Sequence, residues 1–173
     1  MKVALLIAPK DFKDESVSGI RLMLEKWGIE PVITSYSNHD CIGYHGAAYK
    51  PSLNAAAVKP DDFDALVLID GPGVDGYRLY DFRPLLDTVK LFSMRKKLIC
   101  AINNGIKVVA RANIIANVKV AMPQDDETQR LVLLYHGKPS KEGLELDCGI
   151  LTLGNSDRIT EFADMIIRRL GAK

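Results

Sequence analysis

Short apolar runs alternate with segments of helical periodicity, and this alternation constrains the fold of the chain more than any other feature. Near-continuous apolar runs are typical of strands that are covered on both faces. Four runs have this character: residues 3–7, 31–36, 65–69 and 98–102. Repeated strand–helix units imply a mostly parallel sheet with helices on both faces. The sequence therefore predicts a single α/β domain over residues 1–173, organised as a three-layer sandwich.

The segments between these runs predict the remaining elements. Residues 15–27 carry apolar side chains at helical spacing, and Gly28 favours a helix end there. Pro84 suits the first turn of another helix, and Asn155 or Ser156 can cap the last one. The other expected elements are a helix at 104–112, a small hairpin within 43–53, a turn at 70–73, and short strands near 117–122, 130–135 and 145–153.

Charge and cysteine content narrow the class of protein. The net charge is +1, so charge gives no argument for nucleic acid or an anionic membrane as a partner. No apolar run approaches the roughly 18 residues that a membrane span needs, and the apolar N-terminus is expected to be a buried strand rather than a signal peptide. Three scattered cysteines, Cys41, Cys100 and Cys148, argue against a disulfide framework and favour the cytoplasm.

The segment Ile99–Ile106 is the best candidate for a functional site. Its apolar run stops at Ile102 and a helical pattern starts after Gly105, which is the strand–turn–helix order of a nucleophile elbow. The apex of such an elbow normally carries Ser or Cys, but here it carries Asn103. A carboxamide is neither a nucleophile nor a base near neutral pH. Because no Gly-rich phosphate loop or metal-ligand spacing occurs elsewhere, neither a cofactor nor a metal is expected.

Several motifs together resemble the ThiJ/PfpI family of the class I glutamine amidotransferase-like superfamily, and PfpI-type intracellular proteases in particular. The resemblance runs from residue 1 to about residue 170 and implies a flavodoxin-like fold of the class I glutamine amidotransferase type. It also implies a homodimer or a larger homo-oligomer. The motifs that carry it are Lys2-Val3, Phe12-Lys13-Asp14, Gly43-Tyr44-His45-Gly46, Asp62–Leu68, Arg78-Leu79, Ala101–Gly105 and Thr152–Ala163.

The resemblance implies an active site whose reagents are replaced in this chain. Asn103 and Asn104 stand where the family has its nucleophilic Cys and the adjacent His. The family's loop Glu corresponds to Ser16 when counted without a gap, or to the neighbouring Glu15 if the loop is one residue shorter.

Two further positions of that expected pocket follow the third apolar run. Asp70-Gly71 replaces a Gly-Gly turn whose backbone amide helps to form an oxyanion hole, and a carboxylate there would oppose a developing negative charge. Asp75 lies where PfpI-type proteins supply a Glu to the His of a neighbouring subunit, and without the His that role is expected to lapse.

Each candidate residue also has a plainer interpretation. Asn103 is either a ligand-binding carboxamide or a residue tolerated because Asn accepts unusual backbone angles. Cys100 lies inside an apolar run, which favours a buried, inert thiol over a displaced nucleophile. Asp70, Asp75 and Glu15 either converge with Asn103 to hold a cation or an amine, or face water at loop ends; the second interpretation is favoured.

These observations predict a ThiJ/PfpI-like protein without cysteine-dependent hydrolase activity. The absence of any enzyme activity is favoured over its presence. The protein would retain a small-molecule pocket or an assembly role. The alternative is a divergent hydrolase or lyase, related to protease I, that uses carboxylates such as Asp70 and Glu15 at the same pocket. A third possibility is a protein with a purely structural or interaction role.

Overall fold

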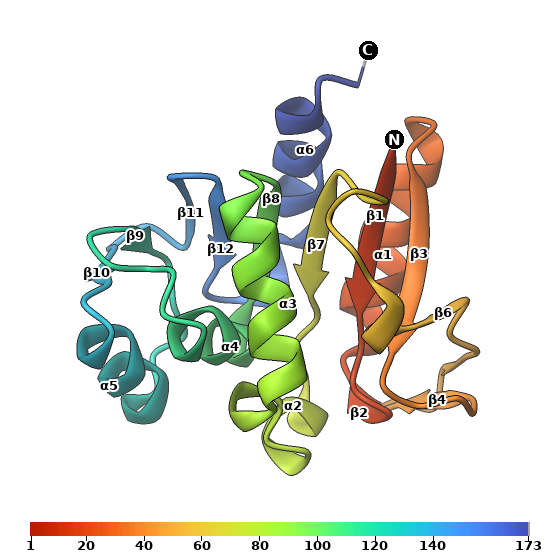
Figure 1. The fold of residues 1–173 in the computed structure, drawn as a ribbon, viewed down its shortest axis with the longest axis horizontal. Coiled ribbons are helices and arrows are strands. Elements are labelled where there is room, and N and C mark those ends of the chain that lie inside the picture. The colour runs from red at the N-terminus through yellow and green to blue at the C-terminus, as the bar shows by residue number, and fades with distance from the viewer. Residues whose placement is uncertain (173) are drawn as a thin grey trace.

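A seven-stranded sheet forms the centre of the molecule in the computed structural model, which describes residues 1–172 (Figure 1). The strand order is β11-β12-β8-β7-β1-β3-β6, and every neighbouring pair is parallel except β11 and β12. The strands are β1 (Lys2–Leu6), β3 (Glu30–Ser35), β6 (Leu53–Asn54), β7 (Ala65–Leu68), β8 (Leu98–Ile102), β11 (Leu144–Asp147) and β12 (Ile150–Leu153). The predicted α/β sandwich with a mostly parallel sheet is thereby confirmed.

Helices cover both faces of this sheet (Figure 1). One apolar core lies between the sheet and α1 and α6, and the other lies between the sheet and α3 and α4. Alternate residues of β1 enter opposite cores: Val3 and Leu5 pack with the first, and Ala4 and Leu6 with the second. The helices are α1 (Asp14–Lys26), α2 (Pro72–Gly76), α3 (Arg83–Met94), α4 (Ile106–Arg111), α5 (Asp126–Leu134) and α6 (Ile159–Leu170).

Short elements complete the fold. A three-stranded sheet of β2, β4 and β5 contains the predicted hairpin, and β9 pairs with β10. Their bounds are β2 (Lys10–Phe12), β4 (Cys41–Gly43), β5 (Ala48–Tyr49), β9 (Lys119–Val120) and β10 (Lys138–Pro139). Four 3-10 helices are η1 (Ala55–Ala57), η2 (Leu79–Asp81), η3 (Asn103–Gly105) and η4 (Ser156–Arg158).

The predicted strand near residues 130–135 is wrong, because this segment belongs to α5. The side chain of Asp125 accepts a hydrogen bond of 2.8 Å from the backbone N–H of Thr128 and thereby caps the helix. Thr128 and Val132, four residues apart, are buried, whereas Leu133 and Leu134 are exposed. The apolar run therefore does not mark a two-sided strand: only one stripe of a surface helix meets the core.

Two other boundaries differ from the expected ones. The predicted turn at residues 70–73 leads directly into α2, where Pro72 occupies the first helical turn. The predicted strand at 145–153 is a hairpin, in which Cys148 and Gly149 both have positive φ angles, 50° and 77°, between β11 and β12. Two residues with positive φ are what a tight two-residue hairpin connection requires.

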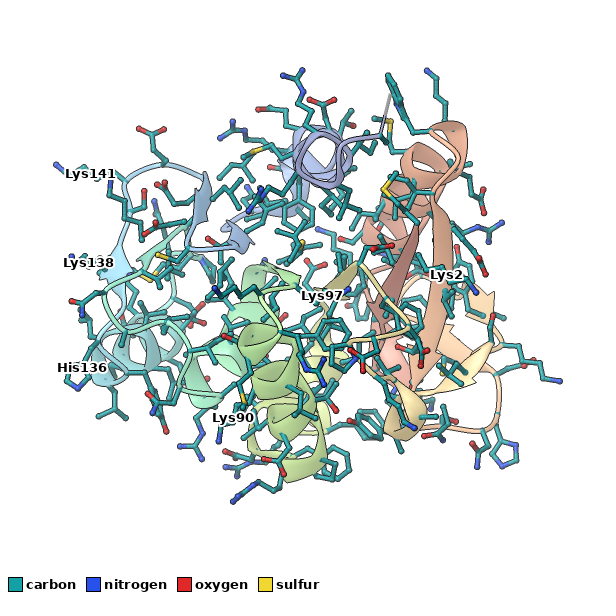
Figure 2. The ribbon with its side chains drawn as sticks, turned by 45° about the horizontal axis from the view of Figure 1, so that its top comes forward. Lys2, Lys90, Lys97, His136, Lys138 and Lys141 are labelled. Atoms are coloured by element: carbon teal, nitrogen blue, oxygen red, sulfur yellow. The ribbon has the colours of Figure 1, made fainter. Side chains whose placement is uncertain are left out.

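Across residues 1–172, no helix combines the length and the apolar character needed to cross a membrane. Cys41, Cys100 and Cys148 are all free thiols. Figure 2 shows Lys2, Lys90, Lys97, Lys138 and Lys141 spread across one view of the molecule rather than gathered in a single patch.

Candidate active-site pocket

The elbow expected from the sequence is present at the C-terminal end of β8. The chain passes from β8 through η3 into α4, and Asn103 adopts a left-handed conformation with φ of 46°. Asn tolerates this region better than most residues other than Gly. Cys100 is fully buried three residues earlier, and burial raises the pKa of its thiol well above the usual range. Cys100 is therefore not a displaced nucleophile.

A cavity of about 560 Å³ opens beside this elbow, and we refer to it as the inner cavity. It lies where parallel sheets commonly bind ligands, beyond the carboxyl ends of the strands. Five of the seven residues proposed from the sequence line it: Asp70, Gly71, Asp75, Asn103 and Asn104. Its other lining residues are Lys13, Pro72, Lys107, Asp125 and Glu127.

Asp70 is the most buried acid of the inner cavity, with only 2% of its surface exposed. Burial raises the pKa of its carboxyl group, and the Ser16 hydroxyl and the charge of Lys13 offset part of this effect. The Ser16 hydroxyl donates to Oδ1 of Asp70 over 2.7 Å. The interpretation that Asp70 faces water at a loop end is therefore wrong, because its side chain is buried and bonded to Ser16 in the first turn of α1.

Asn104 ties the elbow to the turn that follows β7. Its Nδ2 donates to the backbone carbonyl of Gly71 at 2.8 Å, and its Oδ1 accepts from the Gly71 N–H at 3.2 Å. A Cβ at Gly71 would lie 2.5 Å from the carbonyl oxygen of Asp11, and φ at Gly71 is 133°, so only glycine fits. The Gly71 amide, which an oxyanion hole would use, is thus already bonded to Asn104.

Asp75 has a role that the sequence did not predict. Its Oδ2 accepts from Nδ2 of Asn104 at 2.9 Å, and its Oδ1 binds Nζ of Lys107 at 2.8 Å. Nζ of Lys107 also binds Glu127 at 2.7 Å, and it lies 5.2 Å from the centre of the Tyr80 ring. Asp75 therefore anchors the elbow within its own chain, which is separate from the intersubunit role that the resemblance implies for this position.

Lys107 is the charged centre of this network, because its side chain is only 4% exposed. Burial alone would lower its pKa, but the bonds to Asp75 and Glu127 raise the pKa above its usual value. Lys107 stays protonated and links α4 to α2 and α5. Lys107 was not predicted to belong to the site. A lysine inside the apolar segment 106–110 is unusual, however, and could have marked it.

Glu15 does not line the inner cavity. Its carboxylate lies 2.7 Å from Nδ1 of His45, on the exposed hairpin formed by β4 and β5. Ser16, and not Glu15, is the residue of this pair that reaches Asp70. Neither residue lines the inner cavity itself, and Ser16 is linked to it through Asp70.

Among residues 1–172, one group of side chains brings potential metal-ligand atoms within 4.8 Å of one another: Asp14, Glu15 and His45. Asp14 already accepts from the backbone N–H groups of His45 and Ala47, at 2.8 and 2.7 Å. Although burial opposes ionisation, these bonds keep the pKa of Asp14 below its usual value. The Asp14 carboxylate therefore has a structural role in holding the hairpin.

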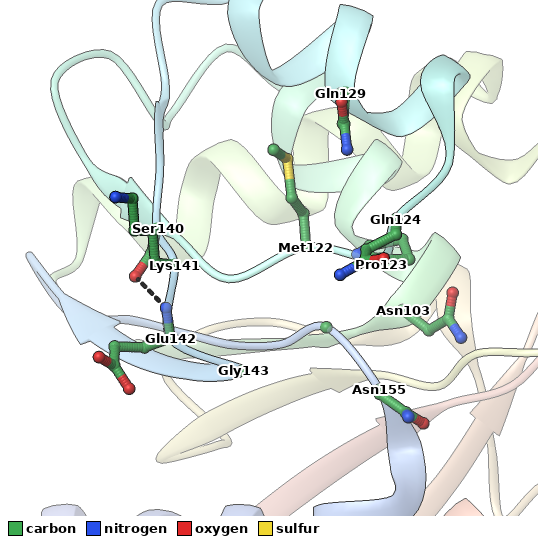
Figure 3. A pocket seen from close by; sticks show the side chains of 11 residues that line it. Asn103, Met122, Pro123, Gln124, Gln129, Ser140, Lys141, Glu142, Gly143 and Asn155 are labelled. Atoms are coloured by element: carbon green, nitrogen blue, oxygen red, sulfur yellow. Dashed lines mark hydrogen bonds between the residues drawn. The ribbon is translucent and has the colours of Figure 1, made fainter.

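A second and larger cleft of about 850 Å³ adjoins the elbow, and Asn103 lines both spaces. We refer to it as the outer cleft. Figure 3 shows Asn103, Gln124 and Asn155 on one side and Ser140 and Glu142 on the other, with Gln129 reaching in from α5. Sequence analysis did not identify this cleft, because its walls come from four segments that are distant along the chain.

The chain is similar to known proteins over nearly its whole length. It is 28% identical over 173 residues to an uncharacterized protein of Methanocaldococcus jannaschii, covering 98% of this chain and 82% of the relative. It is 30% identical over 119 residues to a deglycase of Pyrococcus horikoshii, covering 69% and 70% of the two chains. The crystal structure of a ThiJ/PfpI domain protein from Brachyspira murdochii superposes with a TM-score of 0.92 at 22% identity, covering 99% and 97%.

The family profile described as the DJ-1/PfpI family matches residues 1–130, a segment that contains the elbow, Asp70 and the Lys107 network. The identity to the deglycase agrees with this match. The chain therefore belongs to the DJ-1/PfpI family.

Proposed function

We propose that this protein binds a small molecule at the elbow and carries out no cysteine-dependent hydrolysis or deglycation there. The observation that carries the proposal is the carboxamide of Asn103 at the left-handed apex, where a nucleophile would need a thiol or hydroxyl. The fully buried Cys100 offers no substitute. Relatives such as the Pyrococcus horikoshii deglycase carry an activity name, but a shared fold does not carry the chemistry with it.

The surroundings of Asn103 support the same conclusion. Asn104 accepts the Gly71 N–H, so this donor is not free for an oxyanion. Asp70 stands beside it, and an ionised carboxylate there would repel a developing negative charge. The nucleophile, the base and the oxyanion hole of a cysteine-dependent site are therefore all altered at this one elbow.

A side-by-side turnover assay tests this proposal. Wild type is compared with the double variant Asn103→Cys/Asn104→His and with a triple variant that adds Asp70→Gly, using peptide, ester and small-aldehyde substrates. We expect no turnover by wild type above the uncatalysed rate, and more turnover by the triple than by the double variant. Wild-type turnover that disappears in Asn103→Ala contradicts the proposal.

Asp70 supports a second candidate function, in which carboxylate chemistry replaces cysteine chemistry. Its buried carboxyl group lines the inner cavity, and its raised pKa suits a general acid or base. This candidate is a hydrolase or lyase that depends on Asp70. It predicts turnover that Asp70→Asn abolishes and that Asn103→Ala retains in part, so the same substrate panel separates the two candidates.

We also propose that the protein acts in the cytoplasm as a homodimer or larger homo-oligomer, as the resemblance to PfpI-type proteins implies. Light scattering coupled to size-exclusion chromatography measures the mass directly. A single species at the monomer mass of 19.1 kDa contradicts the assembly proposal.

A further inference from the structure

We infer that the outer cleft binds an uncharged, polyhydroxylated small molecule, that is, a sugar or a polyol. This inference rests on the proposed function, because it names the class of ligand for the same pocket. It is carried by three carboxamide residues that line the cleft from different segments: Asn103 from η3, Gln124 from the loop after β9, and Gln129 from α5.

These three carboxamides have unused hydrogen-bonding capacity. None of them forms a side-chain hydrogen bond with another residue in positions 1–172, in contrast to Asn104, which forms three. Each carboxamide offers two N–H donors and one carbonyl acceptor. Their combined surface therefore matches groups that both donate and accept, and hydroxyl groups do both.

The other uncharged polar side chains of the cleft are already paired. The Ser140 hydroxyl donates to Glu145 at 2.6 Å and accepts from the backbone N–H of Glu142 at 3.1 Å. The carboxamide of Asn155 binds Asp157 through both its oxygen and its nitrogen. These bonds hold the walls of the cleft in place and leave the three free carboxamides as its recognition groups.

Charge at the cleft favours neither an anion nor a cation. Its two ionic side chains, Lys141 and Glu142, are adjacent in sequence, exposed and opposite in sign. An anionic ligand would leave the carboxamide oxygens without donors, and a cationic ligand would leave their N–H groups without acceptors. An uncharged ligand with several hydroxyl groups avoids both costs.

The shape of the cleft favours a small molecule over a peptide. A volume of about 850 Å³ lies within the range of small-ligand sites. Extended peptides usually pair with an exposed strand edge or fill an apolar groove. The walls here come from loops, a 3-10 helix and one face of α5, and none of the lining residues lies in a strand.

Calorimetric titration of the full-length protein with related ligands tests the class of ligand. Glucose is the neutral sugar and sorbitol the neutral polyol, while glucuronate and glucosamine carry a negative and a positive charge on the same ring. N-acetylalanine methylamide represents a peptide. We expect glucose or sorbitol to bind with a millimolar or lower Kd that is insensitive to salt, and the relative affinities of the two show whether the ring matters.

Substitutions of the two glutamines test whether the ligand binds in the outer cleft. Gln129→Met and Gln124→Met each keep the length of the side chain but remove its amide, and each is expected to weaken sugar binding at least tenfold. Lys90→Met, at a partly exposed position of α3 that does not line the cleft, is the control and is expected to bind as wild type does. Gln124 is exposed, so its variant remains informative if Gln129→Met folds poorly.

Other outcomes overturn the inference. It is wrong if neither neutral ligand binds, if only a charged sugar or the peptide amide binds, or if both Gln variants bind as wild type does. These outcomes leave the absence of cysteine chemistry intact. Conversely, chemical conversion of a bound ligand by wild type, detected as a new product, contradicts the proposed function instead.

Discussion

The inner cavity and the outer cleft share Asn103, but their polar groups are used in opposite ways. In the inner cavity, Asn104, Asp75 and Lys107 are bonded to one another and to the chain. In the outer cleft, the carboxamides of Gln124 and Gln129 have no such partners within the described chain. Polar groups that are paired inside the protein hold its structure, whereas groups without a partner are available to a ligand.

The largest expected effect in this comparison comes from Lys107. Lys107→Met leaves Asp75 and Glu127 without their shared cation, and we expect a loss of about 2 kcal/mol in the free energy of unfolding. This figure is below that of a fully buried pair, because both carboxylates remain partly exposed. Urea denaturation measures it, and Lys90→Met should change stability by less than about 0.5 kcal/mol. Equal stability of the two variants contradicts a structural role for the inner network.

The two adjacent asparagines offer a sharper comparison. Asn104→Ala removes three hydrogen bonds around Gly71 and Asp75 and should cost about 1–2 kcal/mol of stability. Asn103→Gly removes an unbonded side chain at a residue with positive φ, so the change should be below about 0.5 kcal/mol. Thermal unfolding of both variants tests this order. A larger loss at Asn103 would show that its side chain also supports the fold.

The smallest expected effect is a dependence of stability on pH at Asp70. Burial raises the pKa of Asp70 in the folded state above its unfolded value of about 3.9, so the folded state binds more protons between these two pKa values. Stability contributed by this group is therefore present below the unfolded pKa and falls as the pH rises through the folded pKa. Asp70→Asn should remove this fall, as measured by urea unfolding over a pH series. An unchanged pH profile would mean that the Asp70 carboxyl group is not perturbed.

Much of the fold could be predicted from the sequence, because local patterns determine it. The apolar run at residues 98–102 predicted β8, and the turn signal at Asn103 predicted the elbow. Pro84 correctly marked the first turn of α3. The segment at residues 130–135 was wrongly predicted to be a strand, because residues 131–134 are continuously apolar. The helix cap at Asp125 lies outside this apolar run.

The candidate site was harder to predict, because its contacts join distant segments. The pairs Ser16–Asp70 and Lys107–Asp75 are 54 and 32 residues apart, and no spacing rule connects them. Asp70 follows an apolar strand, where a charged residue usually marks the solvent, yet it is buried and bonded to Ser16 of α1. The outer cleft has no local motif at all. The elbow at Asn103 was predicted from its strand–turn–helix pattern, whereas the roles expected of Asn104, Gly71 and Ser16 came only from the resemblance, and the function of these residues stays a prediction.

Turnover of small-aldehyde and peptide substrates by wild type and by Asn103→Ala, measured at equal folded concentrations, decides whether the elbow takes part in catalysis. We expect both proteins to stay at the uncatalysed rate, because the elbow carries no nucleophile. Turnover by wild type that Asn103→Ala abolishes would contradict this expectation and would show that the carboxamide at the apex takes part in catalysis.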